Sequence, residues 1–216
     1  NTDKEVSEKY FIKSNRLIND LQRDSIYQRQ EFTKSVIKFF KEPEIVKISK
    51  KIPSDLGEGL IFIIGMPRSG TTLTESIIAT SENWIAGGEK VFFSVNCRPI
   101  IKQYQNENLK FEALLKLGLA YLDTINIQRK GKGIFIDKMP ENYLYYKFIQ
   151  ISLPLAKFIH VYRDPWDNAI SLFKQNFSKE LFYASTFFGI ALEYANYEHI
   201  MNVWKSSDKH DIMDVD

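Results

Sequence analysis

The stretch "LIFIIGMPRSGTTLTESII", residues 60–78, decides the fold. It opens with an uninterrupted apolar run, Leu60 to Ile64, of the kind found in buried parallel strands. Gly65 and Gly70 follow at the spacing of a phosphate-binding loop, and residues 71–80 are expected to form the next helix. A strand that breaks at glycine and enters a helix directs backbone N–H groups and the positive helix end toward an anion.

The loop departs from the common phosphate-binding pattern, in which a lysine follows the second glycine. Here that position is Thr71, and Arg68 lies inside the loop instead. Arg68 offers a planar fork of charge-assisted hydrogen bonds, and Ser69, Thr71 and Thr72 offer hydroxyl groups. These residues predict an anion site. The simpler alternative is a strand-to-helix turn with a solvated arginine.

A nucleoside-triphosphate site is a further alternative for this loop. The missing lysine weighs against it, because that lysine normally reaches the terminal phosphates. The later apolar run "IFID" ends in Asp137, which could act as a magnesium ligand in such a site. The triphosphate interpretation therefore stays open on the sequence.

Composition limits the class of protein. The chain has 216 residues, 44% of them hydrophobic, which suffices for one sizeable core. Its net charge of +2 does not indicate binding of nucleic acid or a membrane through bulk charge. The single cysteine, Cys97, excludes an internal disulfide framework and fits a reducing compartment, so we expect a cytoplasmic protein. No apolar run is long enough for a membrane span. The chain lacks an initiator methionine, and we expect it to belong to a longer protein.

Strands and helices are expected to alternate after an N-terminal helical segment. Residues 1 to about 45 follow helical spacing, and residues 42–59 are expected to form a connector. Beyond the opening run, we expect strands at Gly133–Ile136, Lys157–Tyr162 and His210–Val215, and helices at 108–129, Asn142–Ser152, Pro165–Phe177 and 180–205. This alternation predicts an α/β fold with a mostly parallel sheet. We therefore divide the chain into a helical segment with its connector, 1–58, and an α/β domain, 59–216.

A second basic motif, "VYRDPWDNAISLFKQNF", follows the third expected strand. Arg163 lies at the carboxyl end of that strand, where α/β folds place ligands. Asp164 can cap the next helix, and Pro165 suits its first turn. Ser171 follows about two turns into the helix. The alternative is a helix cap with a structural arginine.

Two shorter runs carry candidate catalytic groups. In "AGGEKVFF", Gly87 and Gly88 could bring the backbone close to a site and point Glu89 inward as a base. The alternative is a surface carboxylate at a helix start. In "IDKMPENY", Lys138 follows the second strand, where it could serve an anion site, be solvated or pair with Asp137.

Other chemistry-bearing residues are expected to be structural. His160 lies inside an apolar strand, and we expect it to be a core residue with hydrogen-bond partners. Trp166 and Phe173 are expected to pack rather than to stack on a base, and His199 and His210 to lie at the surface or pack. No Cys/His cluster has the spacing of metal ligands.

Taken together, these motifs resemble those of a known enzyme family. "IFIIGMPRSGTTL" resembles the 5′-phosphosulfate loop of sulfotransferases that use 3′-phosphoadenosine 5′-phosphosulfate (PAPS). The form P-R-S-G-T-T is similar to the tetratricopeptide-repeat-linked bacterial sulfotransferases and the tyrosylprotein sulfotransferases. The resemblance runs from about Ile61 to the end of the chain. It implies a P-loop nucleoside-triphosphatase-like fold, with PAPS as co-substrate and no metal required. By this resemblance, the phosphosulfate is held by Arg68, Ser69, Gly70, Thr71 and Thr72.

The remaining motifs take their roles from the same resemblance. R-D-P-x-D-x-x-x-S resembles the family's 3′-phosphate motif, in which Arg163 and Ser171 would grip that phosphate. The G-E pair resembles the general-base position, which assigns Glu89. D-K-M-P resembles the position of the lysine that stabilises the leaving phosphate oxygen, which assigns Lys138. Arg68 and Lys138 together would neutralise the departing charge.

The resemblance implies transfer of a sulfuryl group to a hydroxyl or amine acceptor, either a small molecule or a peptide. The alternatives are a magnesium-dependent P-loop kinase or nucleotide hydrolase and a non-catalytic nucleotide-binding domain. Related proteins carry tetratricopeptide repeats upstream, and the family pattern continues past Asp216. The sequence does not identify the acceptor. Tyr143, Tyr145 and Tyr146 could line its cleft or pack in the core.

Overall fold

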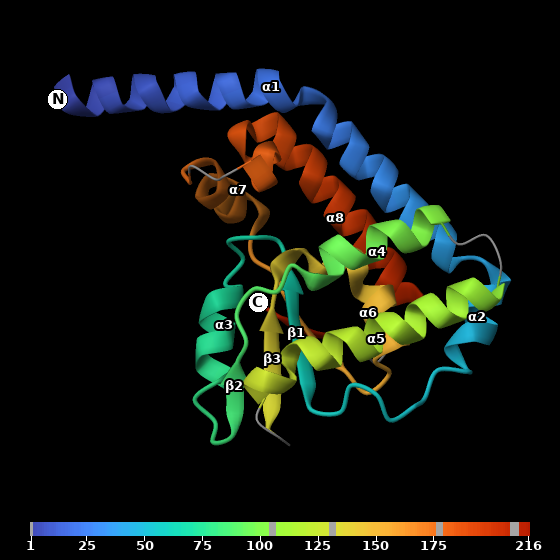
Figure 1. Ribbon diagram of the computed structural model, residues 1–216. Helices are drawn as coiled ribbons and strands as arrows, with labels where there is room; N and C mark the ends of the chain where they lie inside the picture. Colours follow the sequence, from blue (N-terminus) through green and yellow to red (C-terminus); the bar gives the residue numbers. More distant parts are fainter. Residues whose placement is uncertain (1, 104–106, 130–132, 176–178, 208–211) are drawn as a thin grey trace.

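The chain forms an all-parallel sheet flanked by helices, as the computed structural model shows for residues 2–103, 107–129, 133–175, 179–207 and 212–216 (Figure 1). The strand order is β2-β3-β1-β4-β5, and every neighbouring pair is parallel. The strands are β1 (Leu60–Gly65), β2 (Trp84–Ala86), β3 (Ile134–Lys138), β4 (Lys157–Val161) and β5 (Ile212–Val215). The predicted α/β fold class is therefore confirmed.

The helices connect these strands and extend N-terminal to them. They are α1 (Thr2–Phe40), α2 (Pro43–Ser49), α3 (Thr71–Ile78), α4 (Phe92–Gln103), α5 (Glu107–Arg129), α6 (Tyr146–Ser152), α7 (Pro165–Phe173) and α8 (Phe187–Ser207). Two 3₁₀ segments, η1 (Pro140–Tyr145) and η2 (Lys179–Ser185), precede α6 and α8. Within the described part of the chain, no helix is both long and apolar enough to cross a membrane.

Several predicted boundaries differ from the observed ones. The expected connector contains α2, which begins at Pro43 because proline fits the first helical turn. The expected helix over 180–205 is broken, since Leu181 leaves helical geometry with φ −109° and ψ 47°. Helix α7 ends at Phe173, and the prediction that it reaches Phe177 falls partly on residues 176–178, outside the described residues. The first two residues of the expected strand at 210–215 also lie outside them.

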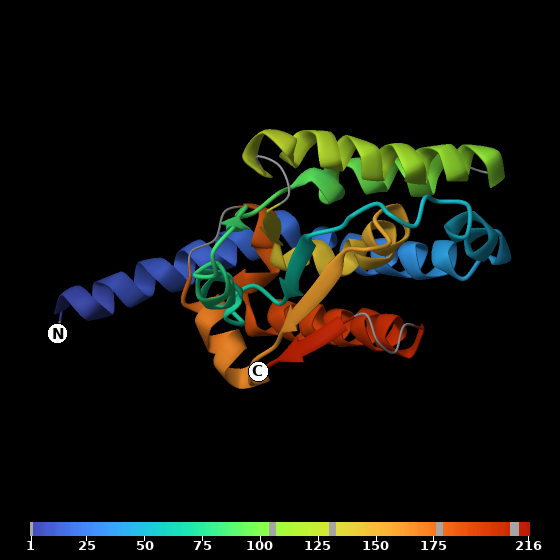
Figure 2. The same cartoon turned by 90° about the horizontal axis from the view of Figure 1, so that it is seen from below.

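The two faces of the sheet are covered unequally. Because side chains alternate along a strand, Phe62, Phe135 and Phe158 share one face, which packs into the main core with α1, α4, α5, α6 and α8. The opposite face carries a smaller cluster around Ile63 and Val161, against which the end of α3 packs. Figure 2 shows α4 and α5 lying together as one layer.

The N-terminal helical segment shares the main core. From α1, Val36, Ile37 and Phe39 are buried in it, and from α2, Ile45 and Ile48. The first half of α1 extends beyond the rest of the fold and passes α7 (Figure 1). The division of the chain at residues 58 and 59 stays a prediction, although residues on both sides of it pack together.

The expected structural residues have mixed outcomes. Trp166 is 74% exposed, so the prediction that it packs is wrong: its place in the first turn of α7 turns the indole outward. Phe173 does pack, with its ring 4.4 Å from that of Phe187. His160 is confirmed as a buried core residue, bonded through Nδ1 to Asp214 Oδ1 at 2.6 Å and through Nε2 to a tyrosine hydroxyl. His199 is exposed, and His210 lies outside the described residues.

Candidate functional site

The glycine loop after β1 forms a tight cradle. Gly65 has φ 151°, and a Cβ there would lie 2.1 Å from the Val161 carbonyl oxygen, so only glycine fits between the ends of β1 and β4. Arg68 has φ 71°, a left-handed backbone conformation that is uncommon for residues other than glycine. Residues with such strained backbones cluster at functional sites. Ser69 is buried, and its hydroxyl has no partner among the described residues. The cradle thus presents a buried donor to whatever enters it.

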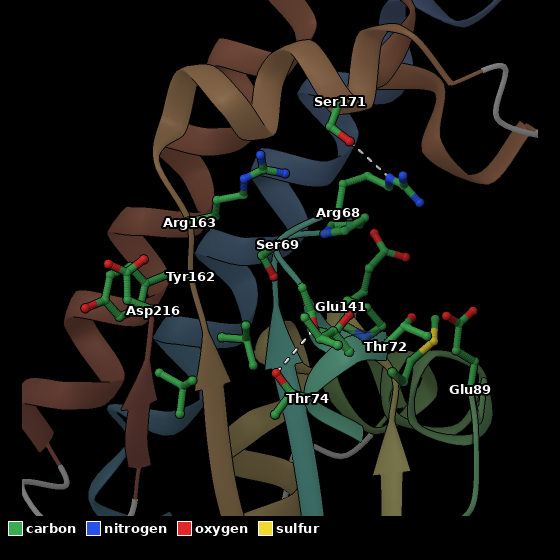
Figure 3. Close-up of a pocket in the computed structure, with 18 of the residues that line it drawn as sticks. Arg68, Ser69, Thr72, Thr74, Glu89, Glu141, Tyr162, Arg163, Ser171 and Asp216 are labelled. Carbon is green, nitrogen blue, oxygen red and sulfur yellow. Dashed lines mark hydrogen bonds between the residues drawn. The ribbon is translucent and has the colours of Figure 1, made fainter. Parts of the chain in front are cut away.

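A cleft of about 730 Å³ opens over this cradle at the carboxyl ends of β1, β3 and β4. Figure 3 shows side chains of the two basic motifs and of Glu89 around it. Its lining includes every predicted donor-site residue and one candidate base: Arg68, Ser69, Gly70, Thr71, Thr72, Glu89, Arg163 and Ser171. Lys138 does not line the cleft but lies directly behind Glu89.

The two basic motifs meet at the upper side of the cleft. Arg68 Nε donates a hydrogen bond to Ser171 Oγ at 3.2 Å, across 103 positions of sequence (Figure 3). Arg163 Nη2 donates to Asp167 Oδ2 at 3.2 Å, and its side chain is 45% exposed. Asp164 caps α7 as expected, accepting from the N–H groups of the next two non-proline residues. The cap fixes the start of α7 and so the relative placement of both motifs.

The candidate base and the candidate lysine form an ion pair. Lys138 Nζ lies 2.5 Å from Glu89 Oε1, with the Lys138 side chain 8% exposed and that of Glu89 57% exposed. Adjacent residues of a strand point to opposite faces of the sheet, so Lys138 and Asp137 cannot face each other. The alternative that Lys138 pairs with Asp137 is therefore wrong.

Asp137 faces the core rather than the cleft. It is 1% exposed, and its Oδ2 accepts a hydrogen bond from the Tyr121 hydroxyl at 2.7 Å. Burial raises the pKa of Asp137 to about 7. The magnesium-dependent alternative needed this carboxylate at the nucleotide, where the structure does not place it. The described ranges contain no group of three or more His, Cys, Asp and Glu side chains able to hold a metal ion.

Glu141 was missed from the sequence, although it lies in the quoted run "IDKMPENY". It lines the cleft and forms an ion pair with Arg29 of α1, whose Nε also lies 2.7 Å from buried Glu193 Oε1. Tyr162 and Asp216 line the cleft as well. Only the assembled fold brings Arg29 of α1 and Asp216, after β5, to this place, so no local pattern identifies those two residues.

A second pocket, of about 530 Å³, adjoins the cleft and shares Met139 and Glu141 with it. Its other walls come mainly from α1, α4, η1 and η2, and they include Ser25, Gln28, Arg29, Ser94, Val95, Arg98, Tyr145 and Phe182. The Arg98 guanidinium lies 4.4 Å from the ring centre of Phe32. Of the three tyrosines considered above, Tyr143 and Tyr146 are fully buried, and only Tyr145 lines this pocket.

Comparison with known proteins gives two findings. A family model described as "Sulfotransferase family" matches residues 61–216, which include all the predicted site residues. An uncharacterized protein of Aquifex aeolicus (strain VF5) is 38% identical over 130 residues. That alignment covers 55% of this chain and 17% of the Aquifex protein. The chain thus spans a small part of the length of this relative.

Proposed function

Because this chain belongs to the sulfotransferase family, we propose that it transfers a sulfuryl group from PAPS to a hydroxyl or amine acceptor. The observation that carries the proposal is the hydrogen bond between Arg68 and Ser171, which joins the two basic motifs in one cleft. Two anion sites suit a nucleotide with phosphates at both its 5′ and 3′ positions.

The loop residues fit the 5′-phosphosulfate. The loop residues line the cleft at the N-terminus of α3, whose positive end favours an anion. The Ser69 hydroxyl has no partner among the described residues, and Arg68 adds a positive charge. Arg163 and Ser171 both line the cleft, and in this proposal they hold the 3′-phosphate, which ATP lacks. Arg163 would exchange its exposed contact with Asp167 for this stronger one.

The transfer step uses Glu89 and Lys138. The acceptor oxygen forms a bond to sulfur, the bond from sulfur to the 5′-phosphate oxygen breaks, and its electron pair stays on that oxygen. Glu89 takes the acceptor proton as general base. Protonation removes the charge that holds Lys138, so its ammonium group becomes available to the leaving oxygen as negative charge develops there.

The acceptor enters, in this proposal, through the second pocket. That pocket shares Met139 and Glu141 with the cleft, and its polar walls suit a hydrogen-bonding small molecule or a peptide. We infer no nucleic-acid or membrane partner, because the net charge is only +2. The buried free thiol of Cys97 favours a cytoplasmic setting. The P-R-S-G-T-T form favours the repeat-linked and tyrosylprotein branches of the family.

Calorimetric titration tests the donor assignment. Adenosine 3′,5′-bisphosphate should bind much more tightly than ADP or AMP, and binding should persist in chelator. Equal affinity for ATP and the bisphosphate would exclude PAPS as the donor, and a strict magnesium requirement would favour a kinase. A screen with sulfate-labelled PAPS against phenols, sugars and peptides then identifies an acceptor.

A further inference from the structure

The segment that carries Glu89 belongs to no helix or strand, yet three hydrogen bonds hold it. The Gly87 N–H donates to the Ile136 carbonyl at 2.8 Å, and the Lys138 N–H donates to the Gly88 carbonyl at 3.0 Å. The Gly88 N–H donates to Glu75 Oε1, also at 3.0 Å. The first two hydrogen bonds join the segment to the backbone of β3, and the third joins it to a side chain of α3.

The two hydrogen bonds with β3 continue the ladder between β2 and β3, but the segment is shifted by one residue relative to β3 between the first bond and the second. A regular parallel ladder that begins with the bond from Gly87 would next use the Gly87 carbonyl, whereas the Gly88 carbonyl is used here. A Cβ at Gly87 would lie 2.4 Å from Phe135 Cζ, so the backbone passes close to β3. Gly88 has φ 67°, with open space where its Cβ would be. Gly88 is therefore required for its backbone conformation rather than for space.

Glu75 binds the Gly88 N–H, which makes no hydrogen bond in the ladder between β2 and β3. Its side chain lies on α3, is 8% exposed and does not line the cleft. A buried carboxylate is costly unless it accepts hydrogen bonds, and this one accepts the Gly88 N–H. Since Lys138 binds the carbonyl of Gly88, both peptide groups that flank its Cα are fixed. The position of Glu89 then follows from α3 and β3 together.

We propose that Glu75 is a positioning residue that holds Glu89 against Lys138. Glu75 lies one turn after Thr71, so the helix whose first residues form the donor cradle also restrains the base. A rigid turn of α3 thereby sets the separation between the bound phosphosulfate and the group that takes the acceptor proton. This inference rests on the proposed role of Glu89 as general base.

Two substitutions separate this role from a general structural one. Glu75→Leu removes the acceptor of the Gly88 hydrogen bond, whereas Glu75→Gln retains an oxygen that can accept it. By amide hydrogen exchange, Gly88 should exchange at least about tenfold faster in Glu75→Leu and close to the parent rate in Glu75→Gln. The exposed neighbour Ser76, changed to Ala, is the matched control. This measurement needs neither donor nor acceptor.

Kinetics then test the consequence for transfer. Glu75→Leu should lower kcat roughly tenfold to a hundredfold, leave the dissociation constant of adenosine 3′,5′-bisphosphate within about twofold, and add little to the defect of Glu89→Gln. Glu75→Gln should recover most of the rate. Unchanged Gly88 exchange or parent kcat in Glu75→Leu overturns the positioning role. A parent rate in Glu89→Gln instead overturns the base assignment, whatever Gly88 does.

Gly88→Ala tests the same restraint if Glu75→Leu does not fold. Alanine has room there but disfavours φ 67°, so the segment should shift without a clash. We expect a lower kcat with unchanged affinity for the bisphosphate. Parent kcat in Gly88→Ala would show that the conformation of this segment does not control the base.

Discussion

Lys138 Nζ lies 2.5 Å from Glu89 Oε1, so the candidate base and the candidate leaving-group cation neutralise each other. When Glu89 takes a proton and loses its negative charge, the Lys138 ammonium group loses its partner and can interact with another negative group. In the proposed reaction the proton that reaches Glu89 and the charge that reaches the leaving oxygen appear in the same step. The ion pair couples these two events.

Glu89→Gln should reduce sulfuryl transfer by about a hundredfold or more, because the amide keeps the size of the side chain but cannot take a proton. Affinity for adenosine 3′,5′-bisphosphate should stay near the parent value, as measured by calorimetry. The defect should shrink with a more acidic acceptor. Glu82→Gln, at an exposed position outside the cleft, is the control. Transfer at the parent rate in Glu89→Gln would refute the assignment of the base.

Lys138→Ala should also slow transfer, but through lost stabilisation of the leaving oxygen. Its defect should therefore shrink when the leaving group is made intrinsically better, as measured with donor analogues of lower leaving-group basicity. Because the two groups form a pair, the double substitution with Glu89→Gln should be less than additive. Additive losses would show that the two side chains act independently.

Arg163→Ala should remove most of the preference for adenosine 3′,5′-bisphosphate over ADP, by about 2 kcal/mol, the usual range for a hydrogen bond to a charged group. Asp167→Asn should increase the preference for the bisphosphate over ADP. The Asp167 carboxylate lies 3.2 Å from Arg163, and without its charge it would no longer compete with the phosphate. Calorimetric titration of both variants measures the two changes. If Arg163→Ala keeps the parent preference, the 3′-phosphate is held elsewhere.

Asp137→Asn should change how stability depends on pH. Burial raises the pKa of Asp137 to about 7 from its ordinary 3.8, so between these values the native protein holds a proton that the unfolded chain releases. The free energy of unfolding then falls as pH rises from about 4 to about 7, by at most about 4 kcal/mol from this group. The Asn variant lacks this term, so its stability relative to the parent should rise across that range.

Urea denaturation at several pH values measures this difference. Asp123→Asn, at an exposed position of α5, is the matched control and should follow the parent profile. A difference between Asp137→Asn and the parent that does not vary with pH would show that Asp137 has an ordinary pKa.

Ser94→Trp should fill the second pocket without touching the donor cradle. The KM for the acceptor should rise about tenfold or more, while affinity for the bisphosphate stays unchanged, if the acceptor binds in that pocket. Asn96→Trp, on the same helix but exposed and outside the pocket, is the control. Unchanged acceptor kinetics in Ser94→Trp would place the acceptor elsewhere.

The sequence predicts the parts of the fold whose signal is local. The run at residues 60–78 predicts β1, its loop and the start of α3, because buried strands and glycine turns each have a characteristic composition. Strand β2 has three residues, and α4 contains Pro99, so neither gives a usable pattern. The exposure of Trp166 follows from the side of α7 that faces outward, which is decided by where α7 lies on the rest of the fold.

The same limit applies to the site. The motifs predict which residues gather in the cleft, since strand ends of a parallel sheet meet at one edge. They do not predict the pairing of Lys138 with Glu89, because the partner arrives on a separate loop. Nor do they reveal Glu75 or Arg29, whose contacts form across 13 and 112 positions of sequence.

The ion pair between Arg29 and Glu141 joins α1 to the lining of the cleft. Arg29 lies in the second half of α1, and the first half contacts α7 through Phe11, whose ring centre lies 5.5 Å from that of Phe173. One helix therefore contacts both sides of the cleft: Glu141 through Arg29 and, through Phe11, the helix that carries Ser171. We expect a change in the course of α1 to alter the proposed donor and acceptor sides of the cleft together.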